Sequence, residues 1–490
     1  MSLGFHTAVA IGLGLYACLM LGMSAYWMSR VRNAADYLVA GRLLPFWVLA
    51  GTITATSIGT GVVIGAPGLA YQHGWAGAAY PIGLGLGTAL AGLLFAATRR
   101  YRFMTLGEEI ACYYGGNRAV TEFSNLSLFL SQLCWLTVQI MGAGSILGAV
   151  TGLEPALCMS LAGLVMAGIS IPGGLKTVAY TDFINASILL AGFGFLTYSS
   201  LVHAGGLAGM RAAVPAAYFS PLGVASYGIW PVAGVILALV LAVIADPGRR
   251  LAMYSARSEN AARWSMVAAG TIVIVFSATV GIIGMYALQL NRHLPSPDQA
   301  LPWLVVNVLP HWLAVVVVIS MTSAMVSCAN ANASATGTFF VRHVYPLFRR
   351  RTPPRPVATV RRTLVIAYVV CTAVALHAGT IVGFVVEFLS ITMSGLAIII
   401  LMGHFWKRAT WQGALAALAV TPAVAIILLF VPGLAGARSN PTIPAAVAGT
   451  VAFIAVSFFT PPGERSFAAT AETLKQERQA IEGETLDRPA

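Results

Sequence analysis

Apolar stretches long enough to cross a lipid bilayer recur along almost the whole chain, and short polar connections separate them. A transmembrane helix needs about 20 predominantly apolar residues, so each run of roughly 18 or more predicts one span. The pattern therefore predicts an all-α polytopic membrane protein with about 13 transmembrane helices. The predicted spans are 5–29, 45–72, 76–97, 122–150, 154–172, 180–203, 230–247, 264–290, 311–340, 361–377, 380–403, 411–431 and 443–460.

Composition agrees with this pattern, since 58% of the residues are apolar and only 9% are charged, which is outside the range of soluble domains. The net charge of +12 does not indicate nucleic acid as a partner, because the basic residues fall in short clusters between spans rather than in one patch. If the N-terminus is outside, only Arg211, Arg292 and Arg438 of the 28 basic residues lie outside. This bias predicts a multi-pass protein of the cell inner or plasma membrane, with its N-terminus outside and its C-terminus cytoplasmic.

Catalytic and metal-binding motifs are not evident in the chain. The six cysteines are scattered without a CxxC pair, so neither a disulfide framework nor a zinc site is indicated. No HExxH or GxSxG occurs either, and we therefore expect that the protein is not an enzyme.

The predicted second span contains an unusual stretch, residues 52–68, with four glycines, one proline and five hydroxyl residues. Gly59 and Gly61 weaken helix continuity and Pro67 lacks a backbone donor, so we expect the helix to break here. A helix break at membrane depth is tolerated where it lines a cavity, and its carbonyls and helix ends can hold a cation or an anionic group. A glycine-rich face for close helix packing explains the same residues, and the stretch alone leaves both interpretations open.

Ionisable residues inside spans are costly and are therefore candidates for function. Asp182 stands at the predicted start of the sixth span, where it could equally be an N-cap, and Asp246 could simply end a helix and pair with a loop arginine. Glu387 lies inside the eleventh predicted span without a basic neighbour in sequence. The ninth predicted span adds a series of small and polar residues between 318 and 338, which could pack closely or supply oxygen ligands.

Six short motifs, in order along the chain, resemble the sodium/solute symporter family. They are ADYLVAGR at 35–42, GAPGLAY at 65–71, TLGE at 105–108, GGL at 173–175 with Thr181 and Asp182, RRL at 249–251 with Arg257 and Ser258, and FWKRAT at 405–410 with Gly413 and Ala414. The resemblance implies a LeuT-type core of two inverted repeats of five helices each. It divides the chain into 1–44 (a peripheral span and inside loop), 45–203 (first repeat), 204–403 (second repeat), 404–460 (two peripheral spans) and 461–490 (a cytoplasmic tail). The tail is expected to be a short polar helix or disordered.

The resemblance also implies a sodium site between the broken helix and the ninth span. Carried over residue by residue, its ligands are the carbonyls of Ala55, Ile58 and Ala324, the hydroxyl of Ser327, and the side chain at Cys328. This last residue departs from the family, which usually has Ser or Thr there, and a thiol is a poor ligand for a hard cation. The solute cavity is expected at the break, lined by Ser57, Thr60 and Gly61 together with Gln139 of the fourth span.

The function that follows is secondary active transport, with Na⁺-coupled symport of a small organic solute by alternating access. H⁺-coupled symport through Glu387, with Asp182 as a further candidate coupling residue, is the alternative within transport. A transporter-like solute sensor is the alternative from another class, although the tail is too short for a signalling domain. The expected partners are the solute and membrane lipid. No lysine or arginine is predicted to lie near the membrane midplane, where it could pair with an acidic solute. The sequence identifies neither the solute nor the oligomeric state.

Overall fold

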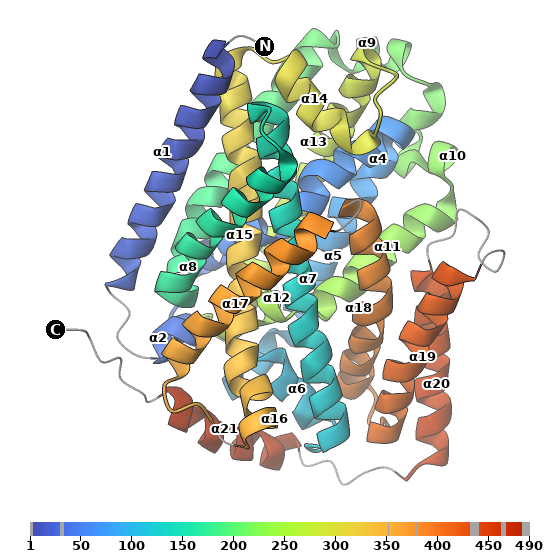
Figure 1. The fold of residues 1–490 in the computed structure, drawn as a ribbon. Coiled ribbons are helices and arrows are strands. Elements are labelled where there is room, and N and C mark those ends of the chain that lie inside the picture. Colours follow the sequence, from blue (N-terminus) through green and yellow to red (C-terminus); the bar gives the residue numbers. More distant parts are fainter. Residues whose placement is uncertain are drawn as a thin grey trace.

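Helices of very different lengths run side by side in a bundle and form nearly all of the ordered structure (Figure 1). The computed structural model describes residues 3–29, 34–350, 352–377, 381–431, 441–461 and 467–482. Within these ranges the β-structure consists of a single isolated bridge between Leu44 and Ala256. The α-helices are α1 (Leu3–Met28), α2 (Ala34–Val39), α3 (Phe46–Ser57), α4 (Ala66–His73), α5 (Ala79–Phe95), α6 (Leu106–Tyr113), α7 (Arg118–Thr151), α8 (Pro155–His203), α9 (Gly206–Ala213), α10 (Val224–Tyr227), α11 (Ile229–Ile244), α12 (Pro247–Tyr254), α13 (Glu259–Leu290), α14 (Ala300–Asn307), α15 (His311–Phe339), α16 (Tyr345–Arg349), α17 (Pro356–His377), α18 (Ile381–Phe405), α19 (Trp411–Phe430), α20 (Thr442–Phe459) and α21 (Phe467–Glu482).

Nine helices in the described ranges are long and apolar enough to cross a membrane, or up to ten if the bent pair α11 and α12 counts as one span. The number of about 13 spans therefore stays a prediction, as do the boundaries of the two repeats. One difference from the expected pattern is that α8 runs through both of the expected spans 154–172 and 180–203.

Different short helices lie at the two ends of the bundle. Short helices α6, α16 and α21 lie at one end, at the bottom of Figure 1, and α9 and α14 lie at the other. We call these the α6 end and the α14 end. The tail, expected to be a short polar helix or disordered, contains helix α21, which packs against α6.

The predicted helix break is confirmed. Helix α3 ends at Ser57, Ile58 leaves the helical region with φ −103° and ψ 70°, and a π-helical turn follows from Gly61 to Gly65 before α4 begins. The glycines act through close approach rather than through an unusual φ, because neither Gly59 nor Gly61 has a positive φ. A Cβ at Gly59 would lie 2.7 Å from the sulfur of Cys328, and one at Gly61 would collide with the Tyr80 hydroxyl.

The broken helix is buried in the centre of the bundle. Helix α3 packs against α8 and α13, and at the break Gly59 lies against Cys328 of α15 and Gln139 of α7. Peripheral helices α1, α19 and α20 instead expose large apolar side chains, including Leu15, Val451 and Phe459. This distribution is what a bilayer requires, since lipid tails solvate apolar side chains.

Candidate functional site

A cavity of about 40 Å³ adjoins the helix break and is lined by residues from α3, α5, α7, α11, α12 and α15. All four residues predicted to contact solute lie in its wall, namely Ser57, Thr60, Gly61 and Gln139. One water needs roughly 10–15 Å³ of such space, so the cavity has room for a few waters but not for an organic solute. Any solute would therefore enter only after the walls move apart.

Gln139 of α7 holds the break in place. Its Oε1 accepts hydrogen bonds from the backbone N–H of Thr60 at 3.2 Å and from the Thr60 hydroxyl at 2.9 Å. Thr60 is completely buried, and it fits there because α7 has Gly142 at the point of contact. A buried backbone N–H released by the break thus finds a side-chain partner, as apolar surroundings demand.

Next to the break, α15 brings the predicted cation ligands together with an acidic side chain. The Ser327 hydroxyl donates to Oδ1 of Asp182 at 2.7 Å, and both residues are completely buried. The second oxygen of Asp182 has no hydrogen-bond partner among the described residues. The N-cap interpretation of Asp182 is wrong, because the residue lies in the interior of α8 and faces α15.

The thiol of Cys328 contacts Ala55, one of the predicted carbonyl ligands, and its neighbour Thr56. It donates to the carbonyl of Thr56 at 3.1 Å and to that of Ala55 at 3.6 Å. Ile58 and Ala324 are also completely buried. Carbonyl oxygens of α3 therefore lie against Cys328 of α15, and the neighbouring Ser327 lies against Asp182 of α8. Carbonyl, hydroxyl and carboxylate oxygens are donors that suit a hard cation.

Asp246 does end a helix and pair with a nearby arginine, as one interpretation of the sequence held. Its Oδ1 caps α12 by accepting from the N–H of Gly248 at 2.7 Å and of Arg249 at 3.4 Å, and its Oδ2 forms an ion pair with the Arg249 guanidinium. However, Arg249 lies in the cavity wall, and its Nη2 is 3.4 Å from the Ser57 hydroxyl. Arg249, which was not among the residues expected at the site, therefore lines the predicted solute cavity.

Arg249 was missed because a basic residue next to a span normally lies in a loop. The signal that could have found it is the Asp246-Pro247 pair after an apolar run. This pair ends α11 and starts α12 at an angle of 46°, which turns Arg249 back toward α3. Glu387, the other candidate, lies in α18 with its side chain outside the described residues.

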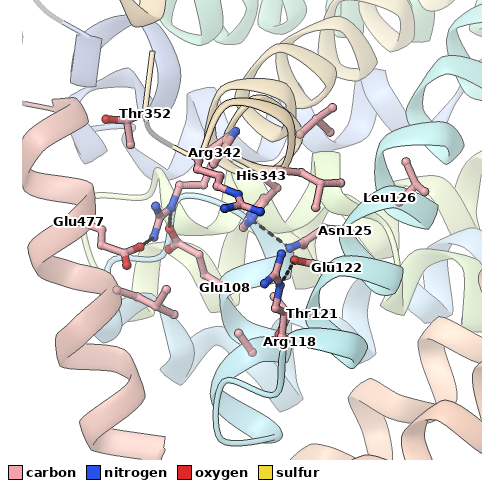
Figure 2. Close-up of a pocket in the computed structure, with 16 residues that line it drawn as sticks. Glu108, Arg118, Thr121, Glu122, Asn125, Leu126, Arg342, His343, Thr352 and Glu477 are labelled. Carbon is pink, nitrogen blue, oxygen red and sulfur yellow. Dashed lines mark hydrogen bonds and ion pairs between the residues drawn. The ribbon is translucent and has the colours of Figure 1, made fainter. Parts of the chain in front are cut away.

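At the α6 end, Glu108 is the centre of a buried ionic network (Figure 2). Its carboxylate, which is completely buried, accepts from Arg342 at 2.6 Å and from Arg478 of α21 at 2.7 Å. Arg342 also pairs with Glu477 of α21 at 2.8 Å. Burial by itself would raise the pKa of the Glu108 carboxyl, but the two guanidinium groups hold this pKa below its usual range.

The neighbouring Glu109 ties α6 to α12. Its carboxylate accepts from Arg250 at 3.2 Å and from the hydroxyl groups of Tyr254 and Tyr113, and the Arg250 guanidinium lies 3.8 Å from the centre of the Phe95 ring. Adjacent carboxylates on α6 thus connect α12, the π-helical turn Phe340–Val344 that follows α15, and α21. Sequence reasoning missed this network because its partners are up to 370 residues apart.

Two larger pockets lie toward the two ends of the bundle. The pocket at the α6 end has a volume of about 470 Å³ and is the one drawn in Figure 2, where His343 is hydrogen-bonded to Asn125 at 2.9 Å and Arg118 pairs with Glu122. The pocket at the α14 end has a volume of about 540 Å³ and is lined by residues that include Ile64 and Met141. These two residues lie two positions beyond Val62 and Gln139 of the central cavity.

Comparisons with known proteins agree with this architecture. A model of the sodium:solute symporter family matches residues 37–421. The chain is 24% identical over 484 residues to a sodium/glucose cotransporter of Vibrio parahaemolyticus, covering 88% of this chain and 85% of that protein. It is 22% identical over 468 residues to a sodium/pantothenate symporter of Haemophilus influenzae, covering 92% and 96%, and 25% identical over 439 residues to a high-affinity proline transporter of Bacillus subtilis, covering 84% and 89%.

Among solved structures, an outward-open Na⁺-coupled sialic acid symporter superimposes with a TM-score of 0.78 at 16% identity, covering 94% of this chain and 99% of that one. A nucleobase-cation-symport-1 family transporter in a closed conformation gives a TM-score of 0.57 at 16% identity, covering 90% and 99%. At such identities the likeness concerns the fold. The expected all-α LeuT-type fold is confirmed.

Proposed function

The chain belongs to the sodium:solute symporter family, and we propose that it couples the downhill entry of Na⁺ to uptake of a small organic solute by alternating access. It is a multi-pass membrane transporter rather than an enzyme, in line with its relatives. Those relatives are named for glucose, pantothenate and proline, so a small solute is the shared feature and its identity differs within the family.

The observation that carries the Na⁺ proposal is the unpartnered oxygen of Asp182 beside the helix break. A completely buried carboxylate without a basic partner among the described residues is unfavourable unless a cation or a proton neutralises it. The Ser327 hydroxyl bonds this carboxylate, and the next residue of α15, Cys328, contacts the Ala55 and Thr56 carbonyls. Together with the carbonyls of Ile58 and Ala324 they are the ligands we assign to Na⁺, which is a substrate here.

The pockets support an alternating-access cycle. The α14-end pocket comes within two residues of the central cavity along both the π-helical turn Gly61–Gly65 and α7. The nearest α7 residue of the α6-end pocket, Leu126, is nine positions from Trp135 of the cavity, which is about 13 Å along a helix. We therefore assign this state as closed toward the α6 end, with the α14-end pocket as the route of entry.

The distribution of charge supports an orientation. Arg99, Arg342 and Arg349 belong to elements at the α6 end, whereas Arg292 lies at the α14 end, where it bonds the Ala213 carbonyl after α9. By the positive-inside rule the α6 end would face the cytoplasm and the α14 end the outside. The solute would then enter from outside and leave at the α6 end, where the Glu108 and Glu109 networks must open.

Proton coupling is the second candidate, and the observation that favours it is the Cys328 thiol on the Ala55 and Thr56 carbonyls. A thiol is a weak ligand for Na⁺, and Asp182 could be neutralised by a proton instead. Glu387 is the other candidate acid for this route. If it carries the proton, Glu387→Gln should abolish uptake driven by a pH gradient while exchange of bound solute continues.

The experiment that separates the two is uptake by the purified full chain in proteoliposomes, with labelled solutes and separately imposed Na⁺ and H⁺ gradients. We expect uptake to need inward Na⁺ and to vanish when choline replaces Na⁺. Asp182→Asn should also abolish binding of radioactive Na⁺ to the purified protein, whereas the exposed-acid control Glu259→Gln should not. Uptake that persists in choline and collapses with a protonophore would replace the Na⁺ proposal by the proton one.

A further inference from the structure

Arg249 has more hydrogen-bond donors than partners. The residue is 9% exposed, and a guanidinium carries five N–H donors in a planar fork. Its Nη1 pairs with Asp246, its Nη2 makes a long 3.4 Å contact to the Ser57 hydroxyl, and its Nε has no partner among the described residues. The Ser57 hydroxyl already donates to the Ile53 carbonyl at 2.6 Å, so it can only accept from Arg249.

Asp246 is held in place by more than this arginine. Its Oδ1 caps α12 by accepting from two backbone N–H groups, and only its Oδ2 forms the ion pair with Arg249. A purely structural ion pair that fastens the bend between α11 and α12 would account for Nη1. It leaves unexplained why the remaining side of the guanidinium lies in the cavity wall beside Ser57 with Nε unpartnered.

The other walls suit a small molecule with one strongly polar end. Trp135, Tyr80 and Leu84 supply aromatic and apolar surface, while the backbone N–H and the hydroxyl of Thr60 already donate to Oε1 of Gln139. Arg249 is thus the charged group in this wall with donors to spare. Carboxylates accept paired N–H bonds from an arginine fork better than other common groups of small solutes.

We propose that the transported solute carries a carboxylate and that Arg249 binds it through the donors that Asp246 leaves free. This inference rests on the proposed function, because it assigns the solute class of the same cavity. In the solute-free state Asp246 holds the guanidinium in place. On binding, the carboxylate takes Nε and Nη2.

Two substitutions should move carboxylate affinity in opposite directions. Arg249→Gln removes the fork and should weaken binding by about tenfold or more, as expected for loss of a charge-assisted bond. Asp246→Asn keeps a good N-cap but releases Nη1, so it should tighten carboxylate binding. A purely structural pair predicts that both changes weaken binding, because either one breaks the fastening of the bend. Arg257→Gln, an exposed arginine in the following loop, is the matched control.

The measurement is ligand-induced thermal stabilisation of the full chain in Na⁺, followed by uptake into proteoliposomes. The probes are lactate, pyruvate, L-alanine and L-proline, each paired with its amide, together with glucose and choline. We expect stabilisation by one of the acids but not by its amide, and the choice between lactate and alanine separates simple acids from zwitterions. Stabilisation by none of the acids, or equal weakening by both variants, would overturn the inference.

Failure of the inference is distinguishable from failure of the proposed function. If glucose or choline accumulates in a Na⁺-dependent manner and the acids do not bind, the transporter assignment stands and the carboxylate assignment is wrong. If an acid binds in an Arg249-dependent manner but its uptake ignores the Na⁺ gradient, the carboxylate assignment stands and Na⁺ coupling is wrong.

Discussion

Removing the Arg478 guanidinium should release helix α21 from the α6 end while leaving the rest of the bundle folded. This side chain is 2% exposed and holds α21 through three contacts. Its Nη1 donates to Glu108 at 2.7 Å, its Nη2 donates to the Tyr101 carbonyl at 2.9 Å, and its guanidinium lies 5.7 Å from the centre of the Phe103 ring. The bundle itself should persist, because Glu108 keeps Arg342 and the Met104 N–H as partners.

The expected size of the effect follows from these contacts. A hydrogen bond to a charged group contributes about 1.5–3 kcal/mol, a neutral carbonyl bond about 1, and a cation–π contact between about 0.5 and 2. The remaining ion pair of α21, between Arg342 and Glu477, involves a half-exposed glutamate and is worth at most about 1 kcal/mol. We therefore expect Arg478→Ala to weaken docking by about 3 kcal/mol, which is about two orders of magnitude in the docking equilibrium.

Hydrogen exchange of the backbone amides in 467–482 measures this directly, because protection reports the fraction of time a segment is docked. We expect exchange to accelerate by about two orders of magnitude in this segment and to change little in α7 and α15. The control is Lys475→Ala on the same helix, where the lysine is half exposed and pairs only with Glu472 at 3.0 Å. Unchanged exchange in Arg478→Ala, or equal acceleration in the control, would refute the reasoning.

Three further predictions concern the networks and the cavity. The folded-state pKa of Glu108 lies below its ordinary value of 4.5, so its contribution to stability is complete above that pH and is lost as the pH falls through the lowered pKa. Docking of α21 should therefore be constant from pH 7 to 5 and weaken only at lower pH, which a fluorescence label on α21 would follow. Glu108→Gln should remove this pH dependence. Gln139→Ala should raise the solute KM about tenfold, and adding Thr60→Ala should cost little more because the two residues share their bonds; an unchanged KM in both variants would place the solute elsewhere. Cys328→Ser should lower the Na⁺ concentration for half-maximal uptake, because an oxygen replaces a sulfur at a hard-cation site, whereas no change in a Na⁺ titration would argue for the proton route.

The membrane helices and the helix break were predictable from the sequence, although the glycines at the break act for a different physical reason than expected. The apolar runs predicted membrane helices, because the burial of one helix in lipid depends on its own residues. Glycines and proline predicted the break after Ser57, yet the glycines serve there to admit Cys328 and Tyr80, which come from other helices. The position of Pro67 in the first turn of α4 follows the ordinary preference of proline for helix starts.

What the sequence by itself determined about this protein is thus its class, its family motifs and the place where its central helix breaks, since each depends on residues close together in the chain. Only the tertiary structure decided which polar groups meet. Asp182 was expected at a helix start, but it faces Ser327, 145 residues away. Arg249 was expected in a loop, but the 46° angle between α11 and α12 places it against Ser57, 192 residues away. Contacts of this kind depend on the directions and packing of several helices at once, and no local pattern of residues encodes them.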